Sequence, residues 1–118
     1  MALKKRVALE LGQGTSLRSG DYTRAAERAV KDALWHNSLN MAQAFSTPKE
    51  AMIIDVDIAV QKPEAVDCAA LAQIFPYGQV AVTARHGGLD ITKPDGSGST
   101  LVALAAVVVS FMVEEAKA

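Results

Sequence analysis

An apolar run near the end of the chain constrains the fold more than any other feature. Residues 101–113 contain no charged side chain and, apart from Ser110, are apolar at both sets of alternating positions. Val107, Val108 and Val109 favour a strand because they are β-branched, although the preceding alanines would tolerate a helix. We interpret the run as a strand, and a strand that is apolar on both faces needs cover on both sides. It is too short to span a bilayer as a helix.

The rest of the chain alternates between strand and helix patterns. Apolar side chains recur with a period of two in residues 52–61, as in a half-buried strand. They recur at helical spacing in residues 22–37, where Asp21 or Thr23 would cap the first turn. Three further elements are predicted: strands at residues 5–11 and 79–85, and a helix at residues 63–74 that begins at Pro63.

This order of elements predicts a single α+β domain over residues 1–118. The expected layout is β-α-β-α-β-β, with about four strands in one sheet and two helices on one face. Residues 89–91 are expected to pair briefly after the turn at Gly87 and Gly88. The helices leave the other face of the sheet bare, and 50% of the 118 residues are hydrophobic. We therefore expect a neighbouring copy of the chain to cover that face in a homo-oligomer.

The charge balance and the single cysteine exclude several classes of partner and cofactor. Twelve basic and thirteen acidic residues give a net charge of −1, which argues against nucleic acid as a partner. Cys68 is the only cysteine, so the chain has no internal disulfide and no Cys/His cluster for structural zinc. No signal peptide or membrane span is predicted. We expect a cytoplasmic protein that needs neither a membrane nor a cofactor.

The first candidate site is a glycine-rich segment after the first predicted strand. Gly12 and Gly14 precede a helix, as in phosphate-binding turns, but position 17 is leucine and the dinucleotide fingerprint is incomplete. In one interpretation, backbone N–H groups and Arg18 hold an oxyanion or a carbonyl group. In the other, the glycines only allow the backbone to turn sharply.

The second candidate site is the loop at residues 93–99. Ser97 and Ser99 lie among glycines, where a hydroxyl is either an exposed nucleophile or part of a plain loop. A serine nucleophile also needs a base. Lys62 is the nearest candidate in the sequence, and the alternative is a solvated lysine before a proline.

Polar residues also mark two strand patterns. Arg85 and His86 lie together at the end of a strand, either as ligand-binding residues or as a polar turn. Asp55 and Asp57 point to one side of another strand. With His86 they would form a metal-dependent site, but a solvated or interface-facing strand explains them equally well.

The segment from Gly12 to Asp21 resembles a family of small conserved proteins of unknown function from bacteria and plants. That family carries the motif G-x-G-x-D-x-H-G after its first strand, and its layout extends over nearly the whole chain. The first two glycines of the motif are present here as Gly12 and Gly14. The chain departs from the motif in having Ser16 for the aspartate, Arg18 for the histidine and Ser19 for the last glycine.

A more distant resemblance is to the ring-opening amidohydrolases, cyanuric acid hydrolase and barbiturase. It rests on the G-x-G motif followed by residues 21–24, on a strand at 56–63 that ends in lysine and proline, and on residues 97–109. The resemblance implies that Ser97 is the nucleophile and that Lys62 activates it without a metal. Lys62 matches with a shift of one residue, because Gln61 occupies the strict register.

The same resemblance implies a chorismate-mutase-like or Rid-like trimer with ligand pockets between subunits. The residues expected to contact substrate are Gly12, Gly14, Arg18, Arg24, Arg85, His86 and Ser99, with Ser99 also as the alternative nucleophile.

Three functions follow as hypotheses. The first is a homotrimer that binds, and through Ser97 hydrolyses, a small cyclic amide or similar planar ligand. The second is a homo-oligomer that binds such a ligand without catalysis. The third is a metal-dependent enzyme that uses Asp55 or Asp57 with His86.

Overall fold

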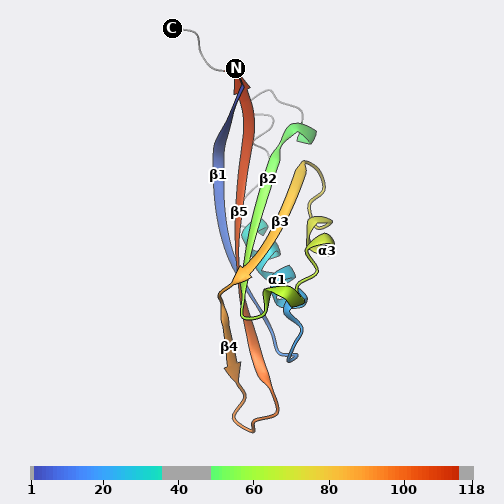
Figure 1. The fold of residues 1–118 in the computed structure, drawn as a ribbon, viewed down its shortest axis with the longest axis vertical. Helices are drawn as coiled ribbons and strands as arrows, with labels where there is room; N and C mark the ends of the chain where they lie inside the picture. The colour runs from blue at the N-terminus through green and yellow to red at the C-terminus, as the bar shows by residue number, and fades with distance from the viewer. Residues whose placement is uncertain (1, 36–48, 115–118) are drawn as a thin grey trace.

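The computed structural model describes residues 2–35 and 49–114, which form one mixed sheet with helices on one face (Figure 1). The elements follow in the order β1 (Ala2–Ser16), α1 (Tyr22–Trp35), η1 (Lys49–Ala51), β2 (Ile53–Val60), η2 (Pro63–Ala65), α3 (Cys68–Ala72), β3 (Gln79–His86), β4 (Leu89–Thr92) and β5 (Ser99–Glu114). The strand order is β1-β5-β2-β3, and β4 also pairs with β5. None of the described helices is long and apolar enough to cross a membrane.

The central strand of the sheet is β5, which was predicted as a strand but not placed within the sheet. It pairs antiparallel with β1 along almost its whole length, and on its other side with β2 and then β4. One alternating set of its side chains is buried beneath the helices: Leu101, Ala103, Ala105, Val107, Val109 and Phe111. The strand predicted at residues 101–113 is therefore confirmed.

The four-stranded β-α-β-α-β-β layout, expected to be chorismate-mutase-like or Rid-like, is wrong. The described part of the chain has five strands, because the segment after β3 forms a strand of its own. Gly88 has a φ of 64°, and a Cβ there would lie 2.3 Å from the carbonyl oxygen of Val102. This close approach lets the chain leave the edge of β2 and pair β4 directly with β5.

The first strand is longer than predicted and includes the two glycines of the G-x-G motif. Gly12 and Gly14 lie within β1, paired with Ala105 and Ala103 of β5. A Cβ on Gly14 would lie 2.3 Å from the backbone nitrogen of Ala29, and one on Gly12 would lie 2.3 Å from the carbonyl oxygen of Ala29. The glycines therefore let the backbone of α1 pack directly on the strand, and they do not form a turn.

The predicted helix from Tyr22 agrees with α1, up to the end of its described part at Trp35. The backbone N–H of Arg24 donates to Asp21 Oδ1 at 3.1 Å, so Asp21 caps the helix as expected. The buried face of α1 is alanine-rich, which suits its close packing on β1. The predicted end at residue 37 and most of the connector at 40–49 lie outside the described residues.

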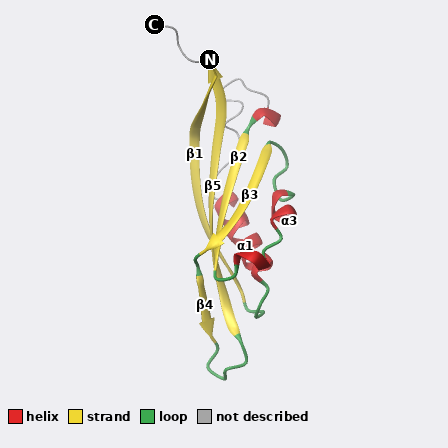
Figure 2. Cartoon of the chain, viewed as in Figure 1, coloured by secondary structure: helices red, strands yellow, loops and turns green. Residues whose placement is uncertain are grey.

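The helix predicted at residues 63–74 is instead two short elements, η2 and α3 (Figure 2). Val66 caps the end of η2, and Asp67 caps the start of α3. The Asp67 side chain accepts a hydrogen bond from the backbone N–H of Ala70 at 3.1 Å, which starts a new helix. Its own backbone N–H donates to Thr23 Oγ1 at 2.9 Å, so the break is tied to the start of α1.

Candidate functional site

The two loops that the sequence singled out meet within one chain. Lys93 Nζ donates to the carbonyl oxygen of Leu17 at 2.7 Å. The backbone N–H of Ser99 donates to Ser19 Oγ at 3.4 Å, and a Cβ added at Gly98 would lie 2.9 Å from Ser19 Cβ. The loop between β1 and α1 is therefore packed against the hairpin turn between β4 and β5.

A cavity of about 320 Å³ opens beside this junction, at the start of α1. We call it the arginine cavity, and its lining residues are Ser16, Leu17, Arg18, Asp21, Arg24 and Arg28. Three guanidinium groups against one carboxylate give the lining an excess of positive charge. The first residues of α1 add to it, because the N-terminal end of a helix dipole is positive.

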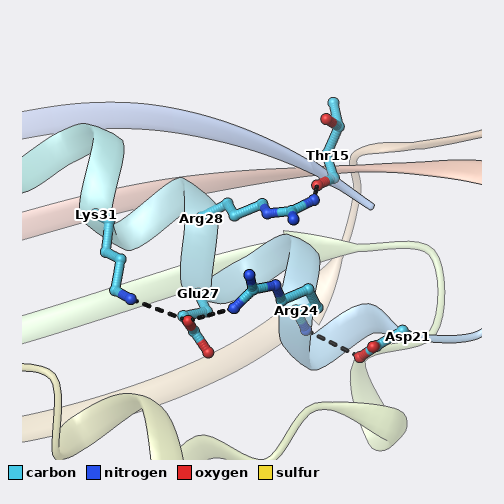
Figure 3. A network of polar contacts seen from close by, with 6 residues as sticks. All are labelled: Thr15, Asp21, Arg24, Glu27, Arg28 and Lys31. Carbon is cyan, nitrogen blue, oxygen red and sulfur yellow. Dashed lines mark hydrogen bonds and ion pairs between the residues drawn. The ribbon is translucent and has the colours of Figure 1, made fainter. Parts of the chain in front are cut away.

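Two of the three arginines are held by groups of the chain itself. Arg28 donates to the carbonyl oxygen of Thr15 at 2.8 Å (Figure 3). Arg24 donates to Glu27 Oε1 at 2.8 Å, and Lys31 shares that oxygen at 3.0 Å. The hydrogen bond from Lys31, with the nearby arginines, lowers the pKa of the Glu27 carboxyl below its usual value. Glu27 therefore stays ionised and orients Arg24.

Arg18 differs from the other two arginines. Its backbone N–H donates to the side chain of Ser16 at 3.2 Å, and Ser16 is buried beneath the loop. No hydrogen bond or ion pair holds the Arg18 guanidinium within the described ranges 2–35 and 49–114. Arg18 thus has a fixed backbone and a guanidinium available to a ligand in the arginine cavity.

The start of α1 is also bonded to β4. Tyr22 is 4% exposed, and its hydroxyl donates a hydrogen bond to Asp90 Oδ2. Burial, together with the Asp90 carboxylate, raises the pKa of Tyr22 to about 12. The phenol is therefore neutral at physiological pH and remains a donor. This bond holds β4, and with it the turn that carries Ser97, against α1.

The structure does not bring Ser97 and Lys62 together within one chain. Ser97 is exposed at the tip of the β4–β5 hairpin, and its backbone N–H donates to Asp95 Oδ1 at 2.9 Å. The Ser97 side chain also hydrogen-bonds Asp95 and lowers the pKa of that carboxyl. Lys62 is exposed directly after β2, and the residue before it, Gln61, contacts Gly87 and Gly88 at the start of β4, the end of that strand remote from Ser97. The lysine that reaches the loop junction is Lys93.

Gln61 has a structural role at the position where the amidohydrolase pattern places its lysine. Its Nε2 donates to the carbonyl oxygens of Gly87 and Gly88, at 3.0 Å each. These two bonds hold the segment that carries the chain from β3 to β4. No local pattern in the sequence indicates this role, because the partners lie 26 and 27 residues further along the chain.

The remaining candidates lie away from the arginine cavity, on or beside β2 and β3. Arg85 donates to Asp57 Oδ1 at 2.8 Å, and Lys4 donates to Asp55 Oδ2 at 2.8 Å. His86 is the last residue of β3 and is exposed. No group of three or more histidine, cysteine or acidic residues suited to a metal ion occurs in the described part of the chain. Each aspartate is instead half of an ion pair.

Sequence reasoning missed the contact that Lys93 makes with Leu17 and four residues of the cavity lining: Ser16, Leu17, Asp21 and Arg28. Arg28 follows Arg24 by four residues in a helix, so the spacing alone places both on one side of α1. The spacing of Arg24 and Arg28 was therefore enough to predict that the two arginines share one side of the helix. Lys93 had no such signal, because its partner Leu17 is 76 residues away.

Comparison with known proteins gives a family and a structural neighbour. A family model described as conserved hypothetical protein (Lin0512_fam) matches residues 6–109. The crystal structure of an FtsZ-like protein of unknown function from Nostoc punctiforme is 30% identical in sequence, with a TM-score of 0.84. The match covers 96% of this chain and 100% of that chain. That neighbour is described as FtsZ-like, whereas the sequence predicted a chorismate-mutase-like or Rid-like layout. No curated protein matches.

Proposed function

We propose that this chain, which belongs to the Lin0512_fam family of conserved hypothetical proteins, binds a small planar anion in the arginine cavity. The observation that carries the proposal is the Arg18 guanidinium, which lines the cavity and has no described partner. Arg24 and Arg28 add positive charge beside it. A binding role without catalysis is the function that this geometry supports best.

The chemistry of the lining defines the ligand class. A guanidinium group is planar and binds two oxygens of a carboxylate, a phosphate or an imide anion at once. The cavity of about 320 Å³ is at the lower end of the range of ligand pockets, which favours a ring or a short acid. The resemblance to ring-opening amidohydrolases suggests cyclic amides, and barbiturate is a planar anion of this kind at neutral pH.

Ring opening by Ser97 is the second candidate. It is supported by the packing of the Ser97 turn against the loop that lines the arginine cavity. Within the described ranges no contact joins Ser97 to a lysine: Lys93 donates to Leu17, and Lys62 follows β2 beside the start of β4. The reaction would therefore need Lys62 from a neighbouring copy, whereas binding needs only the groups already in place.

Arg18→Ala is expected to weaken anion binding at least about tenfold, because a charge-assisted hydrogen bond contributes roughly 1.5–3 kcal/mol. Isothermal titration with barbiturate, cyanurate and inorganic phosphate measures this directly. Arg85→Ala is the matched control, since Arg85 is paired with Asp57 outside the cavity. Equal affinity in the wild type and Arg18→Ala, or no binding of any of the three anions, would contradict the proposal.

Ser97→Ala is expected to leave the affinity for the same anions within about twofold, because no described contact places Ser97 in the cavity lining. The assay that separates binding from ring opening follows barbiturate and cyanurate by ultraviolet absorbance over hours. Stable absorbance with bound ligand agrees with binding alone. Ring opening that disappears in both Ser97→Ala and Lys62→Ala would instead establish the hydrolase.

A further inference from the structure

The face of the sheet opposite the helices carries an apolar surface over β1, β5 and β4. We call it the apolar ridge and define it by Leu9, Leu11, Leu89, Ile91, Leu104 and Val108. Register places these side chains on one face, because Leu9 pairs with Val108, Leu89 with Val102 and Gln13 with Leu104. Leu11 is 64% exposed and Leu89 is 59% exposed. Large apolar side chains gathered in this way mark an interaction surface.

The charges on the helix-free face balance one another. Register of the described strands puts three cations and three carboxylates there: Lys4, Arg6, Arg85, Asp55, Asp57 and Glu114. Lys4 pairs with Asp55 and Arg85 pairs with Asp57, each at 2.8 Å. The ridge itself contains no charged residue. A nucleic acid or an anionic membrane would require an excess of cations at this position. The helix-free face of a second copy can pack on this one, because both faces have an apolar centre and balanced charge around it, and neither repels the other.

The size of the face agrees with what a stable association needs. The five strands contain between 4 and 16 residues each. With the usual rise per residue and strand spacing they form a sheet of roughly 800 Å². A standard interface buries about 800 Å² on each partner, so one copy of this face is large enough to hold a second molecule.

We infer that the helix-free face is an interface between copies of this chain, with the apolar ridge at its centre. A second copy supplies an equally apolar and equally neutral surface at the same concentration as the first. The pairs Lys4–Asp55 and Arg85–Asp57 then lie beside the apolar contact, where polar groups form the rim of an interface. Two copies packed face to face form a closed dimer with a two-fold axis, whereas the homotrimer expected from the sequence would bring different parts of this face together around a three-fold axis. The inference does not depend on the ligand.

Mutation of the ridge tests this interface. The wild type is expected to show a mass in solution that is a multiple of 12.4 kDa, measured by light scattering during size-exclusion chromatography. Leu11→Glu with Leu104→Glu is expected to reduce the mass to 12.4 kDa, because each new carboxylate would be desolvated between two copies. Trp35→Glu is the matched control: Trp35 is 85% exposed at the end of α1, and its replacement should leave the mass unchanged.

Two results would overturn the inference. One is a wild-type mass of 12.4 kDa at the highest soluble concentration, which would leave the ridge to another protein or to no partner. The other is an unchanged mass in a folded double variant, with native circular dichroism and cooperative unfolding. If the double variant does not fold, Leu11→Ser alone replaces it, since Leu11 is largely exposed in the single chain. That variant should raise the dissociation constant of the assembly at least about tenfold.

Discussion

Gly14→Ala is expected to lower the free energy of unfolding by about 3 kcal/mol, the upper end of the usual cost of overpacking. The new Cβ would lie 2.3 Å from the backbone nitrogen of Ala29 and 2.5 Å from the carbonyl oxygen of Ala25. Both atoms belong to the backbone of α1, so no side-chain rotation relieves the overlap. The helix must move away from β1, which opens the core between them. Urea unfolding followed by circular dichroism measures the change.

Gly96→Ala is the control for the loss of a glycine without a packing clash. Gly96 lies in the β4–β5 turn with a φ of 73°, and a Cβ there meets nothing within 4 Å. Its replacement should cost only about 1 kcal/mol of left-handed backbone strain. If the two variants lose equal stability at one protein concentration, α1 does not pack on β1 through the glycines.

Tyr22→Phe is expected to lower the free energy of unfolding by roughly 1.5–3 kcal/mol, because it removes a hydrogen bond to a carboxylate. The ring still fills the buried position at the start of α1, so the change isolates the bond between Tyr22 and Asp90. A double-mutant cycle with Asp90→Asn separates this bond from the general effect of each substitution. A coupling energy near zero would mean that Tyr22 and Asp90 do not stabilise each other.

The same bond predicts a pH dependence whose direction follows from the pKa of Tyr22. Folding raises this pKa from 10.0 to about 12, so the unfolded chain loses the phenolic proton first as the pH rises. The stability contributed by the neutral phenol is fully present below pH 10 and is lost between pH 10 and pH 12. The difference in stability between the wild type and Tyr22→Phe should therefore shrink across this window. A constant difference from pH 8 to pH 12 would contradict the assignment.

The elements with a strong local period were predictable from the sequence. β2 was predicted within one residue at each end, because its β-branched side chains alternate regularly. The start of α1 was equally clear, since Asp21 caps a helix whose small apolar residues recur at helical spacing. β5 was recognised from its apolar composition, although its pattern alone did not exclude a helix.

The site was only partly predictable. Arg18 was a candidate from the glycine-rich segment and Arg24 from the resemblance to amidohydrolases, and both line the arginine cavity. Gly12 and Gly14 were interpreted as a ligand-binding turn, yet they lie inside β1 beneath α1. Glycine is needed equally where a chain turns and where two backbones touch, so the residue type does not distinguish the two cases.

The sequence by itself determined the elements with a strong local pattern: the strand β2, the start of α1 with its cap at Asp21 or Thr23, and the apolar strand β5. Only the tertiary structure decided that β4 pairs with β5, that the loops carrying Ser19 and Lys93 meet, and that the arginines share a cavity. The physical reason is the range of the interactions. Side-chain periodicity and capping act over a few residues, whereas these contacts join segments up to 80 residues apart. The residues next to Ser19 or Lys93 in the sequence therefore do not indicate which distant segment either of them contacts.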